Sequence, residues 1–185
     1  MNLANKISLL RIILIPFFIL LFYGFFLWNW SWAGYAAIVV FLLAAFTDFL
    51  DGYVARKYHM VSALGKLMDP LADKLFIMSV MVCLVNYSMV AVWAFIVVLA
   101  REFLITGLRS VAAAEKIVIA ASRWGKAKTV SQIITAGLIL VNVFILSESF
   151  PAVNAALYAC VLIMTALTVY SGVDYMYKNR RLLKN

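Results

Sequence analysis

The sequence is poor in charged residues, proline, histidine and cysteine. Only 13% of its 185 residues are charged, whereas 66% are hydrophobic, and the mean hydropathy is +1.02. An ordinary soluble domain is about 25% charged and roughly 45–50% apolar. The composition therefore excludes a water-soluble globule. Cys83 and Cys160 both lie inside apolar runs, where we interpret them as small packing residues.

Long apolar runs occupy most of the chain. Since one membrane crossing takes roughly 20 apolar residues, the chain has room for about five or six helices once loops are subtracted. Segments in which apolar and polar residues alternate are absent, which excludes a membrane β-barrel. We therefore predict an all-α integral membrane protein in which residues 1–185 form a single domain.

The number of helices depends on residues 75–100, which carry no charge and could form one tilted helix or two helices joined at residues 86–88. A turn there places all sixteen basic residues on the side of the N-terminus or at helix ends facing it. This agrees with the enrichment of basic residues in cytoplasmic loops. A single helix would divide them between both faces. We therefore predict six transmembrane helices with both termini cytoplasmic, at about residues 9–28, 33–56, 65–86, 89–110, 126–146 and 152–176.

The net charge of +8 and the pI near 9.6 raise the question of a nucleic-acid partner. In a membrane protein the same excess is typical of basic loops and tails on the cytoplasmic face, where they contact anionic lipid. We therefore expect membrane lipids as partners and no nucleic acid.

Four of the eight acidic residues fall between positions 48 and 73. Asp48 and Asp51 are three residues apart and Asp69 and Asp73 are four apart, so each pair projects from one face of a helix. The apolar run before Asp48 and the run at residues 75–86 are each too short to cross about 30 Å of hydrocarbon. The transmembrane helices must therefore include the aspartates.

The short connection between these two helices makes them antiparallel neighbours, so the four carboxylates are predicted to share one pocket near the cytoplasmic surface. Carboxylates within about 4 Å of one another protonate or bind cations. Oxygen ligands without nearby His or Cys favour Mg²⁺, Mn²⁺ or Ca²⁺ over zinc, and we predict a two-metal site. A small cation transporter is the alternative, because buried acids also mark ion pathways. Their clustering toward one face argues against transport.

The pattern around these acids resembles the signature of the CDP-alcohol phosphatidyltransferases. All eight fixed positions are present in Asp48-x2-Asp51-Gly52-x2-Ala55-Arg56-x8-Gly65-x3-Asp69-x3-Asp73. The resemblance implies a membrane transferase of phospholipid biosynthesis, often a homodimer. Such an enzyme moves a phosphatidyl group from CDP-diacylglycerol to an alcohol and releases CMP with the help of two divalent cations, Mg²⁺ or Mn²⁺.

The same resemblance implies roles for these residues. The four aspartates would hold the metals, and Asp73 would be the general base on the acceptor hydroxyl. The cytidine diphosphate pocket would be lined by Asp48, Gly52, Ala55, Arg56 and Gly65. The small residues in this set leave room either for a close helix approach or for a flat ligand group. This active site would face the cytoplasm.

The acceptor alcohol must be recognised by other residues, and the basic candidates are Arg101, Arg109, Arg123, Lys126 and Lys128. Arginines on one helix can bind a phosphate bidentately, although Arg101 could instead pair with Glu102 or with lipid headgroups. Residues 5–16, 100–109 and 124–129 resemble stretches of bacterial phosphatidylglycerophosphate synthases, which implies sn-glycerol 3-phosphate as acceptor.

The expected reaction therefore joins CDP-diacylglycerol and glycerol 3-phosphate into phosphatidylglycerophosphate and CMP within one catalytic domain. Another acceptor, such as inositol phosphate, serine or phosphatidylglycerol, would use the same chemistry.

Overall fold

A computed structural model describes residues 3–58, 63–114, 117, 122–146 and 150–180. For residues 3–8, 48–58, 63–73 and 114 it describes the backbone alone. Within these ranges the chain forms six α-helices and one short π-helix and contains no strand. The prediction of an all-α protein is confirmed.

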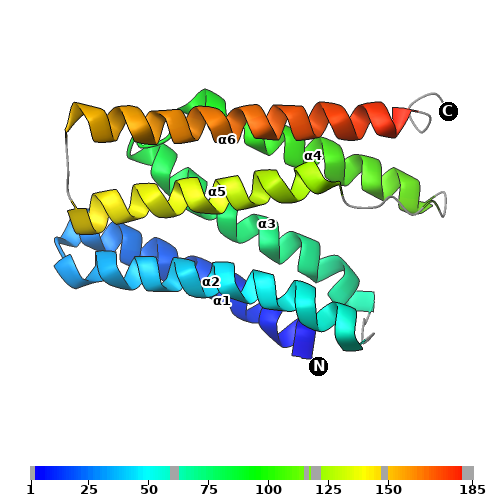
Figure 1. Cartoon of the computed structure of the whole chain (residues 1–185). Coiled ribbons are helices and arrows are strands. Elements are labelled where there is room, and N and C mark those ends of the chain that lie inside the picture. Colours follow the sequence, from blue (N-terminus) through cyan, green and yellow to red (C-terminus); the bar gives the residue numbers. More distant parts are fainter. Residues whose placement is uncertain (1–2, 59–62, 115–116, 118–121, 147–149, 181–185) are drawn as a thin grey trace. The chain divides into compact units, whose positions relative to one another are not determined.

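The helices follow one another with short connections (Figure 1). They are α1 (Leu3–Trp28), α2 (Ser31–Tyr58), α3 (Ala63–Asn86), α4 (Val92–Ala114), α5 (Arg123–Val141), the π-helix η1 (Asn142–Leu146) and α6 (Pro151–Lys178). Two residues outside helices adopt positive φ angles, Asn29 at 53° after α1 and Ser88 at 57° after α3. Such left-handed residues end helices. The uncharged stretch therefore forms two helices joined by a turn, as the distribution of basic residues predicted.

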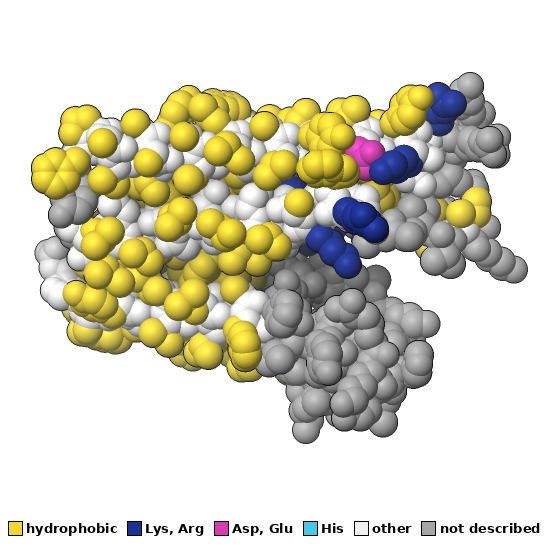
Figure 2. All heavy atoms as spheres, viewed as in Figure 1, with side chains coloured by type: hydrophobic (Ala, Val, Ile, Leu, Met, Phe, Trp, Pro, Cys, Tyr) yellow, Lys and Arg dark blue, Asp and Glu magenta, His cyan; other side chains and the backbone are white. Residues whose placement is uncertain are grey.

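Apolar side chains cover the helices, as a lipid environment requires. Residues 9–28, 123–146 and 151–178 are long and apolar enough to cross a membrane, and residues 31–47 and 74–86 form shorter apolar stretches. Large hydrophobic side chains are exposed on the helices, including Phe17 of α1, Leu42 of α2 and Phe103 of α4 at 55%, 56% and 69%. On the face shown in Figure 2, charged side chains gather near one end of the helices that carry them. The chain is a multi-pass membrane protein.

The chain divides into two compact units. The first unit comprises residues 1–86 and 136–148, in which α1 packs against both α2 and α3. Its core is aromatic: the ring centroids of Phe18 and Phe76 lie 5.9 Å apart, and those of Phe41 and Phe76 lie 6.3 Å apart. Phe144 of η1 extends this core, with its ring 5.6 Å from Phe22 and 4.8 Å from Phe25. The interior described for this unit is thus closely packed and mostly apolar.

The second unit comprises residues 87–135 and 149–185, in which α4 packs against α6. Ile105, Leu108 and Tyr175 form a buried contact cluster, and Met176 packs against it. Several buried side chains in this unit are polar, in contrast to the aromatic core of the first unit. They are Glu102, Lys128, Gln132, Thr135, Thr165, Thr168 and Ser171.

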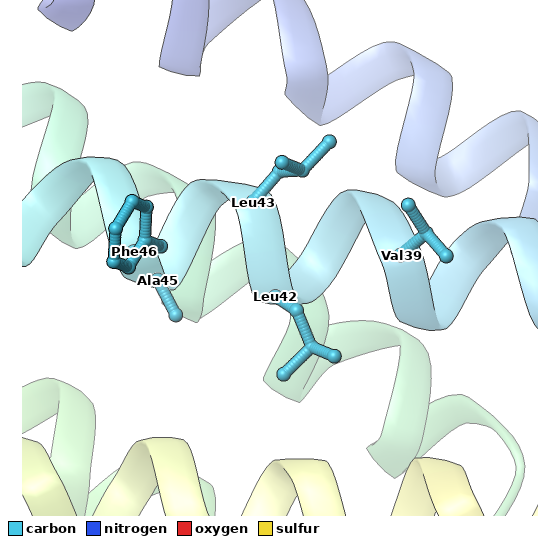
Figure 3. Close-up of a pocket in the computed structure, with 5 residues that line it drawn as sticks. All are labelled: Val39, Leu42, Leu43, Ala45 and Phe46. Carbon is cyan, nitrogen blue, oxygen red and sulfur yellow. The ribbon is translucent and has the colours of Figure 1, made fainter.

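An apolar hollow of about 580 Å³ lies along α2, shortly before Asp48 in the sequence. It is lined by Val39, Leu42, Leu43, Ala45 and Phe46, with Leu42 and Leu43 pointing to different sides of the helix (Figure 3). Because these side chains offer almost no polar atoms, the hollow suits hydrocarbon rather than a polar ligand.

Candidate functional site

The four aspartates of the sequence pattern lie within helices. α2 continues through Asp48 and Asp51 to Tyr58, and α3 begins at Ala63, before Asp69 and Asp73. The prediction that the helices include these acids is confirmed. Helical geometry places the members of each pair on one face, because they are three and four residues apart. Their side chains lie outside the described residues, so the shared pocket stays a prediction.

The residues expected to line the cytidine diphosphate pocket also lie on these two helices. Gly52, Ala55 and Arg56 lie on α2 and Gly65 lies on α3, and their side chains are likewise outside the described residues. Among the side chains that the structure describes, no three His, Cys, Asp or Glu come together as a metal site. The aspartates remain the candidate ligands, and a set made only of carboxylate oxygens fits Mg²⁺ or Mn²⁺.

In the second unit, Glu102 joins two of the five cationic residues proposed for the acceptor. Its Oε1 accepts a hydrogen bond from Arg101 Nη1 at 3.0 Å and a second one from Lys128 Nζ. The three side chains are 8%, 10% and 6% exposed for Glu102, Arg101 and Lys128. One carboxylate therefore faces two buried cations in this ion cluster (Arg101, Glu102 and Lys128).

Two glycines lie against Arg101, and one of them makes room for it. A Cβ atom added to Gly172 of α6 would lie 3.2 Å from Arg101 Cγ, and one added to Gly125 of α5 would lie 3.6 Å from Arg101 Nη2. The first distance is tighter than most Cβ contacts, so any larger residue there would displace the arginine stem. Residues from α4, α5 and α6 therefore all help to place this one guanidinium.

Gln132 adjoins the ion cluster and was not among the predicted site residues. Its Oε1 accepts a hydrogen bond from Lys128 Nζ at 3.3 Å, and the residue is only 1% exposed. Its Nε2 and Arg101 Nε are buried and have no hydrogen-bond partner among the described residues. An unsatisfied buried donor costs about 1–3 kcal/mol, so two such donors beside one cluster point to a missing polar partner.

Arg109 lies on α4 at a different place from the ion cluster. Its Nε donates a hydrogen bond of 3.0 Å to the hydroxyl of Tyr175, and its guanidinium carbon lies 5.7 Å from the centre of the Tyr175 ring. Tyr175 is 2% exposed and packs against Ile105 and Leu108, so it holds the arginine from a fixed position. Lys126, by contrast, is exposed on α5.

The structure thus brings together Arg101 and Lys128 of the five predicted cations, places Arg109 against Tyr175, and leaves Arg123 and Lys126 exposed at the start of α5. Sequence reasoning missed Gln132 and Tyr175 as partners of these cations. The available signal for Gln132 was its position one helical turn after Lys128, since residues four apart share a helix face.

Comparison with known proteins identifies relatives of this chain. Residues 1–170 match the family model of CDP-alcohol phosphatidyltransferases. The CDP-diacylglycerol–glycerol-3-phosphate 3-phosphatidyltransferase of Bacillus subtilis (strain 168) is 41% identical over 192 residues, covering 99% of this chain and 97% of that protein. The enzyme of the same name from Rickettsia typhi is 41% identical over 141 residues, covering 76% of this chain and 77% of that protein.

A third relative is the probable phosphatidylglycerophosphate synthase of Mycobacterium tuberculosis (strain H37Rv), which is 39% identical over 184 residues, covering 97% of this chain and 82% of that protein. The matches extend far beyond the segment that holds the eight signature positions, through all six helices. Together with the acids carried inside α2 and α3, they show that the chain belongs to the CDP-alcohol phosphatidyltransferase family.

Proposed function

We propose that this chain transfers the phosphatidyl group of CDP-diacylglycerol to sn-glycerol 3-phosphate, giving phosphatidylglycerophosphate and CMP. The observation that carries the proposal is the 41% identity to the Bacillus subtilis enzyme of that name over 99% of the chain. The complete set of signature residues on continuous helices supports it, because the acids that the chemistry needs are retained in a transmembrane setting.

In this proposal the first unit binds the donor and its metal ions. Asp48, Asp51, Asp69 and Asp73 hold two divalent cations, and Asp48, Gly52, Ala55, Arg56 and Gly65 line the site for the cytidine diphosphate. When bound, Mg²⁺ or Mn²⁺ neutralises charge on the diphosphate and on the departing CMP. The donor's acyl chains remain in hydrocarbon, for which apolar surfaces such as the hollow along α2 are suited.

The chemical step needs one base. Asp73 takes the proton from the C1 hydroxyl of glycerol 3-phosphate, and the resulting oxygen bonds to the β-phosphorus of the donor. The bond from that phosphorus to the oxygen of CMP breaks, so CMP leaves with the electron pair. No covalent bond to the protein forms. Recognition of the acceptor phosphate is assigned to Arg101, Arg109, Arg123, Lys126 and Lys128, and the burial of two cations side by side supports this role for Arg101 and Lys128.

The active site and both termini are proposed to face the cytoplasm, and the chain is proposed to act as a single catalytic domain and as a homodimer. The basic residues that follow α6, such as Arg180, support this orientation, because positive charge is retained on the cytoplasmic side. Labelling of cysteines introduced at Asn2 and Asn185 in intact cells tests the orientation. A reagent that cannot cross the membrane should label neither site before lysis.

The activity is tested with purified protein, CDP-diacylglycerol and a panel of radiolabelled acceptors: glycerol 3-phosphate, inositol phosphate, serine and phosphatidylglycerol. We expect a labelled lipid and CMP only with glycerol 3-phosphate and only with Mg²⁺ or Mn²⁺, and chelation by EDTA should stop the reaction. If another acceptor gave the labelled lipid, the chain would be a family member with a different acceptor specificity.

Cation transport, the alternative from another class, requires a polar path through the membrane. The described interior of the first unit is instead mostly filled by phenylalanine rings, and its buried polar side chains are those of Arg11 and Asn142. Cation flux in proteoliposomes without any release of CMP would favour transport over the proposed reaction.

A further inference from the structure

Gln132 offers a buried hydrogen-bond donor in one defined direction. The residue is 1% exposed, and its Oε1 accepts from Lys128 Nζ at 3.3 Å. An ammonium group has hydrogens to donate and no lone pair to accept with, so the amide oxygen must face Lys128 and the amide nitrogen must face away. The orientation of the side chain is thereby determined by its neighbour.

The amide nitrogen of Gln132 has no hydrogen-bond partner among the described residues, and neither does Arg101 Nε. Both groups are donors, and both adjoin Glu102 or Lys128, in a region that holds the two buried cations Arg101 and Lys128. A partner that satisfies them must accept hydrogen bonds and benefit from positive charge. A phosphate oxygen meets both requirements, whereas an apolar group or a cation meets neither.

We propose that Gln132 is a further acceptor-binding residue, whose Nε2–H, oriented by Lys128, donates to a phosphate oxygen of the acceptor alcohol. This inference rests on the proposed function, because the acceptor is taken to be sn-glycerol 3-phosphate. It adds a neutral, directional donor to the charged residues. Charge attracts an anion from any direction, but a fixed amide selects where the phosphate oxygen lies and so helps to place the attacking hydroxyl.

The test compares two substitutions of similar size. Gln132→Met removes both the donor and the acceptor of the amide. Gln132→Glu keeps an acceptor for Lys128 but replaces the donor by an anionic oxygen. We expect the KM for glycerol 3-phosphate to rise about 10- to 100-fold in Gln132→Met, the range for loss of a hydrogen bond to a charged group, and at least as much in Gln132→Glu. The KM for CDP-diacylglycerol should change less than about twofold in both.

A matched control is Thr135→Val, which alters a buried polar residue one turn further along α5. Thr135 donates a long hydrogen bond of 3.5 Å to the carbonyl of Cys160 and has no contact with the ion cluster among those described. It should leave both KM values unchanged. Glycerol 3-phosphate should also raise the thermal unfolding temperature of the wild type and of Thr135→Val, but much less that of Gln132→Met, which reports binding without turnover.

The outcomes separate the inference from the proposed function. Near-normal acceptor affinity in Gln132→Glu would show that the amide serves only to hold Lys128, and unchanged affinity in Gln132→Met would show that its partner is only a buried water. Either result overturns the inference while the wild type still makes phosphatidylglycerophosphate. If the wild type instead uses another phosphorylated acceptor, the proposed function fails, and a rise in the KM for that acceptor in both variants still supports Gln132 as a phosphate donor. Use of an acceptor without a phosphate would overturn both.

Discussion

The two units of this chain differ in what they bury. The first unit packs most of its described interior with phenylalanine rings, although it also buries Arg11 and Asn142, and it holds five of the eight acidic residues, four of them in the signature. The second unit buries an ion cluster, an amide and several hydroxyls, and it holds ten of the sixteen basic residues. The first unit is therefore nearly balanced, with five acidic and six basic residues, whereas the second has a basic excess of ten against three.

The difference fits an enzyme whose two units bind different parts of the reacting system. Charge inside a membrane protein must be balanced by a partner or a ligand. The four signature acids of the first unit are proposed to bind cations, whereas the two cations that face Glu102 in the second unit are proposed to bind an anion. We propose metal and diphosphate chemistry for the first unit and recognition of the acceptor phosphate for the second. The substitutions below test these roles and the packing of the two units.

The largest effect is expected from Asp73→Asn in the first unit. Removing the proposed general base should lower kcat by about 10²–10⁴-fold, because an amide cannot take the proton of the acceptor hydroxyl. The measurement is CMP release at saturating concentrations of both substrates. Metal binding should be measured in parallel, since Asp73 is also a proposed ligand.

The control for this change is Asp174→Asn, the same substitution on α6. Asp174 pairs with Lys178 at 2.8 Å, and the lysine side chain is 60% exposed. An exposed ion pair of this kind contributes about 0–1 kcal/mol, so both activity and stability should stay near those of the wild type. Full turnover in Asp73→Asn with normal metal binding would refute the assignment of Asp73 as the general base. The first unit would then lose its proposed role in the chemical step.

The next largest effect is expected on stability, from Glu102→Gln in the second unit. The change leaves Arg101 and Lys128 buried without their shared carboxylate, and breaking a buried ion pair costs about 3–5 kcal/mol. Unfolding by denaturant in detergent micelles, followed by tryptophan fluorescence, measures the free energy of unfolding.

Lys128→Met separates the effect of the ion cluster on stability from its effect on acceptor binding. It leaves Glu102 paired with Arg101 at 3.0 Å, so it should cost less stability than Glu102→Gln, yet it should raise the KM for the acceptor. If Lys128→Met instead left acceptor affinity intact, the ion cluster would be a structural feature only, and the second unit would lose its proposed role.

A smaller effect is expected from Gly34→Ala, which tests the packing of the first unit. The added Cβ would lie 2.9 Å from the ring of Phe144, and overpacking of this kind costs about 1–3 kcal/mol. Gly107→Ala in the second unit is the matched control, because nothing lies within 4 Å of its added Cβ. Alanine there should be neutral or stabilise by about 0.5–1 kcal/mol, since it favours the helix. Equal effects at both positions would contradict the close packing of the first unit.

Much of the fold could be predicted because hydrophobic runs and charge placement report directly on membrane helices. The predicted span 33–56 corresponds to α2 (Ser31–Tyr58), and the turn after residue 86 was inferred from the side on which basic residues fall. The presence of Asp48 within a helix followed from the length of the preceding apolar run. The shared pocket of the four acids and their metals stays a prediction.

The polar contacts of the second unit could not be predicted in the same way. Glu102 and Lys128 are 26 residues apart, and their contact depends on how α4 and α5 are rotated about their axes. Hydropathy does not determine that rotation when lipid-facing and buried positions are both apolar. From the sequence, Arg101 could pair with Glu102 or with lipid headgroups, and the structure shows that it pairs with Glu102. The π-helix of Asn142–Leu146 likewise has no signal in the apolar run that contains it.

The smallest effect is expected from Tyr175→Phe, which removes a single oxygen. The variant loses the 3.0 Å hydrogen bond from Arg109 Nε but keeps the ring on which the guanidinium lies. A net loss of about 0.5–1.5 kcal/mol of stability is expected for one such bond. If Arg109 also binds the acceptor phosphate, its looser placement should raise the KM for glycerol 3-phosphate several-fold and leave that for CDP-diacylglycerol unchanged. A loss of stability without any change in acceptor affinity would instead confine Arg109 to holding α4 against α6, and the acceptor site would then rest on the other residues proposed for it.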